Sequence, residues 1–100
     1  MSSLRQKQSE FTKAVGLLIL YAYQLGYELT LGDAYATTGH IANSFHYNRL
    51  AIDLNLFIDG EYIKDDRGHK ELGAFWKSIG GTWGGDFRNK DYNHYSWGEG

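Results

Sequence analysis

The segment from Leu50 to Asp59 constrains the fold more than any other part of the chain. Apolar side chains occupy every second position on one of its faces, at Leu50, Ile52, Leu54, Leu56 and Ile58. Because successive side chains of a strand point to opposite faces, this pattern predicts a strand with one buried face. The opposite face carries Asp53 and Asn55, so any chemistry on this strand is expected there.

The N-terminal segment is expected to form the helix that covers the buried face. Ser3 and Gln6 fit a capping box, and Gly26 suits a left-handed helix end. Between these signals the apolar residues recur at helical spacing, at Phe11, Val15, Leu18, Ala22 and Leu25.

Shorter segments complete the expected fold. We expect strands over 27–31, 61–63 and 93–97, a second helix over 72–79, and loops over 32–44 and 80–87. The Asp59-Gly60 pair predicts a hairpin turn, and His69 is expected to lie exposed at the start of the second helix. The chain is therefore expected to form one α+β domain over residues 1–100. Its small, mostly antiparallel sheet would pack against the N-terminal helix and a short second helix.

Composition restricts the partners that this chain can bind. With a net charge of -2, the chain lacks the basic excess that is typical of nucleic-acid binding, so no nucleic-acid partner is expected. The apolar run Val15–Tyr23 is shorter than the roughly 20 residues that span a bilayer, so no membrane insertion is expected. The residues around this run do not resemble a cleavable signal peptide.

A set of His and Asp residues indicates a metal site. The sequence has no Cys, so nitrogen and oxygen atoms must bind any metal. His46 precedes the long strand, Asp53 lies within it, and His94 lies on the last strand, three residues after Asp91. Two imidazoles and one carboxylate leave a tetrahedral position open for water, as in catalytic zinc sites. The alternative is that Asp53 pairs with a Lys or Arg and that the histidines share no role.

Two segments resemble the metal motifs of the VanY/VanX-type zinc peptidases, the M15 family. Residues 44–53, Ser-Phe-His-Tyr-Asn-Arg-Leu-Ala-Ile-Asp, are similar to the first motif, S-x-H-x-x-G-x-A-x-D. Residues 91–94, Asp-Tyr-Asn-His, are similar to the second, an acidic residue followed three positions later by a zinc-binding His. The Gly-Trp-rich segment 80–87 resembles the approach to this second motif. The run from Leu50 to Gly60 resembles the phage endolysin branch, whose members cut the L-alanyl–D-glutamate bond of peptidoglycan.

The resemblance implies a role for individual residues. By position, His46, Asp53 and His94 would bind Zn²⁺, and Asp91 would be the general base. Further candidates for the site are Ser44 beside the first ligand, and His40, Trp83 and Arg88 as substrate-binding residues. Two positions depart from the family pattern, because Arg49 replaces the Gly of the first motif and Ala36 replaces an Arg that contacts substrate.

The function implied is a zinc metallopeptidase that hydrolyses an amide bond of bacterial peptidoglycan stem peptides. The first expectation is an L-alanyl–D-glutamate endopeptidase, acting as a monomeric endolysin that is made in the host cytoplasm and reaches the cell wall after release. The alternatives are a D-alanyl-D-alanine carboxypeptidase or dipeptidase, and a catalytically impaired member that binds stem peptides without cutting them. The Ala36 replacement is the feature that favours the impaired member.

Overall fold

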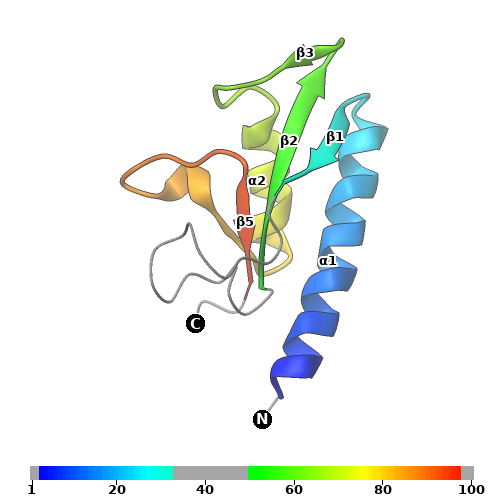
Figure 1. Ribbon diagram of the computed structural model, residues 1–100, viewed down its shortest axis with the longest axis vertical. Coiled ribbons are helices and arrows are strands. Elements are labelled where there is room, and N and C mark those ends of the chain that lie inside the picture. Colours follow the sequence, from blue (N-terminus) through cyan, green and yellow to red (C-terminus); the bar gives the residue numbers. More distant parts are fainter. Residues whose placement is uncertain (1–2, 33–49, 98–100) are drawn as a thin grey trace.

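The computed structural model describes residues 3–32 and 50–97. Its elements are α1 (Leu4–Gln24), β1 (Glu28–Leu31), β2 (Ala51–Ile58), β3 (Glu61–Tyr62), α2 (His69–Ser78), β4 (Thr82–Trp83), the 3-10 turn η2 (Gly84–Asp86) and β5 (His94–Ser96). The five strands form one sheet in the order β1-β2-β5-β4, with β3 also paired to β2. Every pair is antiparallel, and α1 runs along the sheet beside β1 and β2 (Figure 1). The expected α+β class is therefore confirmed.

Strand β2 pairs with β1, β3 and β5, and its two faces differ as predicted except at the strand ends, where Ala51 is buried and Ile58 is only half-buried. The side chains of Ile52, Leu54 and Leu56 are at most 6% exposed and belong to the hydrophobic core. The intervening Asp53 and Asn55 are only half-buried. Helices α1 and α2 contribute Phe11, Ala14, Val15, Leu18, Ala22, Leu72 and Trp76 to the same core, and Asp53 lies on the opposite face of β2.

Helix α1 begins with the predicted capping box. The Ser3 hydroxyl accepts a hydrogen bond from the Gln6 amide at 3.1 Å, and the Gln6 side chain accepts one from the Ser3 amide at 2.8 Å. Gly26 follows the helix with φ of 84°, the left-handed conformation expected at its end. The predicted apolar face is buried except at Leu25, which is 38% exposed because it lies in the cap beyond the last helical turn. Among the described residues, no helix is long and apolar enough to cross a membrane.

The Gly-rich segment contains a strand that the sequence pattern did not predict. Thr82 and Trp83 form β4 and pair with Ser96 and Tyr95 of β5. The short strand depends on partners elsewhere in the chain, because the Trp76 indole of α2 donates to the Thr82 carbonyl at 3.1 Å and to the Ser96 carbonyl at 2.9 Å. Helix α2 is thereby joined to both β5 and the edge strand β4.

The expectation that His69 is exposed was wrong. His69 opens α2 but is only 1% exposed, and its Nδ1 lies 2.9 Å from the Tyr95 hydroxyl. Tyr95 is itself fully buried on β5, so the polar pair is enclosed between α2 and the sheet. The burial follows from a partner 26 residues away in sequence, which no local pattern indicates.

The buried imidazole predicts a pH-dependent stability. Burial lowers the pKa of His69 from 6.5 to about 4, so the unfolded chain binds an extra proton between these values. Stability is therefore expected to be complete above about pH 6.5 and to fall as the pH drops towards 4, by about 2–3 kcal/mol from this group. Urea unfolding of metal-free protein between pH 4 and 7.5 measures this loss. The His69→Gln variant should show a flatter profile, and profiles of equal slope would contradict the assignment.

Candidate metal centre and active site

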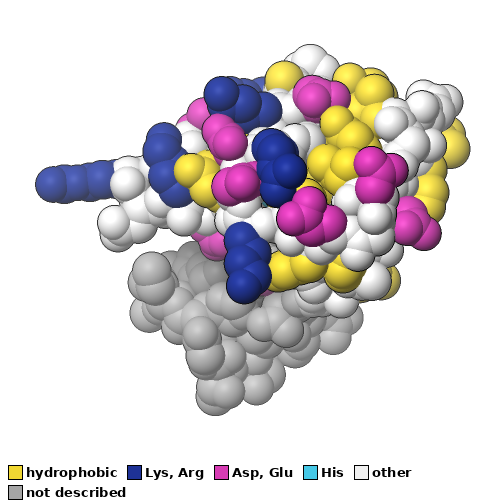
Figure 2. All heavy atoms as spheres, turned by 90° about the horizontal axis from the view of Figure 1, so that it is seen from above, with side chains coloured by type: hydrophobic (Ala, Val, Ile, Leu, Met, Phe, Trp, Pro, Cys, Tyr) yellow, Lys and Arg dark blue, Asp and Glu magenta, His cyan; other side chains and the backbone are white. Residues whose placement is uncertain are grey.

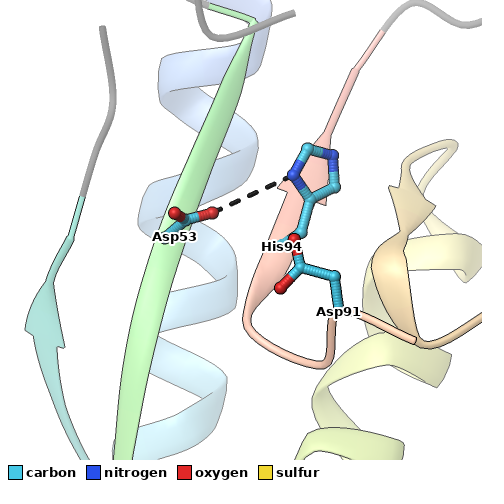
Figure 3. Close-up of side chains that lie close together, drawn as sticks. All are labelled: Asp53, Asp91 and His94. Atoms are coloured by element: carbon cyan, nitrogen blue, oxygen red, sulfur yellow. Dashed lines mark ion pairs between the residues drawn. The ribbon is translucent and has the colours of Figure 1, made fainter. Parts of the chain in front are cut away.

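Asp53 and His94 face each other across two neighbouring strands. They are directly opposite in the antiparallel register of β2 and β5, which places their side chains on the same face of the sheet. Asp53 Oδ1 lies 3.9 Å from His94 Nδ1 (Figure 3). His94 is 9% exposed and Asp53 is half-buried, so the pair lies in a largely desolvated position.

Asp91 brings a second carboxylate to this pair. It lies in the connection before β5, and the turn between them is closed by the His94 amide, which donates to the Asp91 carbonyl at 3.1 Å. One ligand atom from each of Asp53, Asp91 and His94 lies within 4.8 Å of the others (Figure 3). Unlike the other two residues, Asp91 is exposed to solvent.

The connection that carries Asp91 is held at several points. The Trp83 indole donates to the Tyr92 carbonyl at 2.8 Å, and the Leu54 amide donates to the Asn93 carbonyl at 2.9 Å. The Asn93 side chain also donates to the Asn55 side chain at 3.3 Å. These bonds tie the residues between Asp91 and His94 to β2 and β4.

A neighbouring ring and a backbone contact restrict the two predicted ligands. The Phe87 ring packs against the His94 imidazole with 5.2 Å between centroids, which restricts the orientation of the imidazole. On the other side of β2, the Gly32 amide donates to the Asp53 carbonyl at 2.7 Å. A side chain at position 32 would start 3.0 Å from Asp53 Cβ, so a residue without a side chain allows this close approach.

Gly84 also lies close to the cluster, and replacing it with Ala is expected to have a large effect on stability. A methyl group there would overlap the Asp91 carbonyl oxygen and lie 2.8 Å from His94 Cβ. The Asp91 amide also donates to the Gly84 carbonyl at 3.0 Å, so neither backbone can move away freely. We expect Gly84→Ala to destabilise the protein by about 1–3 kcal/mol and to displace Asp91.

Chemical unfolding and metal titration of Gly84→Ala test this expectation. Gly16 provides the matched control, because a Cβ there would meet nothing within 4 Å. Gly16→Ala should leave metal affinity unchanged. Equal behaviour of the two variants would mean that the Gly84 contact does not constrain the cluster.

The donor set fits a divalent metal of the zinc type. Zinc in proteins is bound by His nitrogen and carboxylate oxygen, and the cluster offers one imidazole and two carboxylates. Asp53 and His94 were predicted as ligands, and the structure brings them together. His46, the third predicted ligand, lies outside the described residues, as do Ser44 and His40 and the departures Ala36 and Arg49.

The two remaining predicted substrate residues have different surroundings. Trp83 is 6% exposed and packs over Gly73 and Gly85, so the structure places it in the core beneath the Asp91 connection. Arg88 is exposed on the segment between η2 and β5. Substrate contact by either residue stays a prediction.

The residues that position the cluster were not predicted from the sequence. The Asn55–Asn93 bond and the Gly84 contact depend on the strand register, which spacing alone does not reveal. The sequence did indicate that Asn55 and Asn93 lie near the cluster, because Asn55 shares a face of the strand with Asp53 and Asn93 precedes His94.

Comparison with known proteins adds an independent finding. The family model of M15 peptidases described as D-alanyl-D-alanine carboxypeptidase matches residues 37–97, more than half of the chain. The matched region includes Asp53, Asp91 and His94, together with His46. No curated protein matches the chain.

Proposed function

The chain belongs to the M15 family of metallopeptidases, and we propose that it is a zinc-dependent peptidase acting on the stem peptides of bacterial peptidoglycan. The observation that carries this proposal is the cross-strand pair of Asp53 and His94, with Asp91 within 4.8 Å of both. The bond between L-alanine and D-glutamate is the first candidate for cleavage, and an endolysin released from the host cytoplasm is the corresponding biological role.

Each residue of the cluster has a part in the proposed reaction. Asp53 and His94 would hold the zinc ion together with His46, which the sequence motif supplies. A zinc ion bound there supplies Lewis acidity, which makes water more acidic and polarises the scissile carbonyl. Asp91 is exposed beside these ligands, so it is the group available to exchange protons with substrate.

Asp91 acts in two successive proton transfers. Its carboxylate accepts a proton from the attacking water as the water oxygen bonds to the carbonyl carbon. It then gives that proton to the amide nitrogen as the carbon–nitrogen bond breaks, which releases a carboxylic acid and a free amine. The Asp91 amide donates to the Gly84 carbonyl and the His94 amide donates to the Asp91 carbonyl, so the backbone that carries this carboxylate is held on both sides.

A D-alanyl-D-alanine carboxypeptidase is the second candidate. The description of the matching family favours this activity. It requires the same metal chemistry and the same proton transfers, and it differs only in which residues of the stem peptide flank the scissile bond. A member that binds stem peptides without cutting them would keep the ligands and lack turnover.

Product analysis distinguishes these functions. Zinc-loaded protein is incubated with purified peptidoglycan, and the products are examined by mass spectrometry and amino-terminal labelling. A new amino terminus on D-glutamate supports the endopeptidase, and released D-alanine supports the carboxypeptidase. The Asp91→Asn variant is the control for contaminating activity. If the zinc-loaded protein binds peptidoglycan but releases no product, the peptidase function is wrong and the chain is a member that binds stem peptides without cutting them.

A further inference from the structure

A cavity opens beside the metal cluster on the side of Asp91. Its volume is about 250 Å³, and the connection between β3 and α2 and the segment 90–93 before β5 form its walls. The lining includes Asp91, the residue proposed to move protons. His69, the buried residue at the start of α2, also lines it, which anchors that wall to the core.

Two lysines give the cavity its charge. Lys64 and Lys90 both line it, one from each wall, and both are exposed. Other lysines of the chain have acidic partners, such as Lys70 with Asp66 at 3.5 Å and Lys77 with Asp86 at 2.9 Å. Within residues 3–32 and 50–97, no ion pair involves Lys64 or Lys90.

The local arrangement, rather than a general basic surface, distinguishes this cavity. Viewed from the end of the molecule that bears β3, basic side chains lie interspersed with acidic ones (Figure 2). Among the described residues that line the cavity, Asp91 is the one acidic side chain, and Lys64 and Lys90 supply two ammonium groups. Ammonium groups bind carboxylates through charge-assisted hydrogen bonds, so the cavity suits an anionic group.

We propose that this cavity binds the carboxylate carried by the substrate residue on the amine side of the scissile bond. The proposal rests on the proposed peptidase function. Asp91 is the residue proposed to donate the proton to the leaving amine, and it also lines the cavity, so the substrate residue that bears this amine would lie beside the cavity that Lys64 and Lys90 line. The volume accommodates a single residue rather than a longer segment of peptide.

Both candidate substrates carry a carboxylate at this position. In the L-alanyl–D-glutamate bond, the amine belongs to D-glutamate, which is linked onward through its side chain and keeps a free α-carboxylate. In the D-alanyl–D-alanine bond, the amine belongs to the last residue, which carries the terminal carboxylate. Lys64 and Lys90 could therefore bind the carboxylate of either substrate. Acid and amide forms of each peptide show which of the two carboxylates is bound.

The test compares acid and amide peptides on lysine variants. The probes are L-alanyl-γ-D-glutamyl-L-lysine and its D-isoglutamine form, and L-lysyl-D-alanyl-D-alanine and its terminal amide. For the acid peptide that is cleaved, we expect Lys64→Met/Lys90→Met to raise KM about tenfold, with kcat within about twofold. For the matching amide, KM should change by less than about twofold. Lys13→Met, an exposed lysine on α1 away from the cavity, is the matched control.

The outcomes separate this inference from the proposed function. Cleavage by the wild-type protein with equal KM changes for acid and amide, or with none, would overturn the carboxylate site and leave the peptidase function standing. If wild-type protein cleaves neither acid peptide, the peptidase function fails, and calorimetric binding of the same four peptides decides the inference. Tighter binding of one acid peptide than of its amide, lost in the lysine variant, supports the carboxylate site. Equal binding of acid and amide by the wild-type protein overturns the carboxylate site.

Discussion

Replacing Asp91 with Asn is expected to lower kcat on peptidoglycan peptides by about 10²–10⁴-fold, while zinc affinity stays within about tenfold of the wild-type value. The amide has nearly the shape of the carboxylate but cannot accept the proton of the attacking water. Because Asp91 is exposed and its backbone is held by Gly84 and His94, the substitution should leave the fold intact. Steady-state kinetics and zinc titration on the same preparation measure the two effects together.

Asp86→Asn is the matched control for this variant. Asp86 is an exposed carboxylate of η2 that pairs with Lys77 at 2.9 Å and does not belong to the cluster. It should retain near wild-type kcat. If Asp91→Asn instead loses zinc, Asp91 is a ligand rather than the general base. If the variant keeps full activity, another group moves the proton.

The second large effect is expected from the ligands on the sheet. Asp53→Asn and His94→Gln should each weaken zinc binding by more than about 100-fold and abolish hydrolysis, because each removes one of the few ligands of the ion. The two residues are paired in register at the centre of the sheet, so a single substitution cannot be offset by a shift of its neighbour. Zinc titration against a competing chelator measures the affinities, and circular dichroism of metal-free protein checks the fold.

His69→Gln is the control that separates a ligand from a structural histidine. His69 is buried against Tyr95 and lies outside the metal cluster. We expect its substitution to change stability with little effect on zinc affinity. Zinc binding by Asp53→Asn and His94→Gln as tight as that of wild type would remove the basis for the proposed centre.

Local patterns in the sequence were sufficient for the main elements of the fold. The alternation through β2 and the capping box of α1 each involve residues close together in the chain, and both predictions are confirmed. Strand β4 was missed because Thr82–Trp83 becomes a strand through pairing with β5 and hydrogen bonding to Trp76. The burial of His69 was missed for the same reason, since its partner Tyr95 is distant in sequence.

The candidate site was predicted in part. The position of Asp53 on the face opposite the apolar row followed from the alternation of β2, and the structure agrees. That Asp53 lies directly opposite His94 depends on the strand order and register, which the sequence does not specify. The roles of Asp91 and His46 came from the resemblance of their motifs to the M15 family, and the family match supports that resemblance.

Anomalous X-ray scattering from crystals of the zinc-loaded protein shows whether Asp53 and His94 bind the ion. Data collected on both sides of the zinc absorption edge locate the ion without reference to activity. We expect one strong peak between Asp53 and His94, about 2.0–2.2 Å from an imidazole nitrogen and a carboxylate oxygen. A zinc peak elsewhere on the molecule, with none between these two strands, would contradict it.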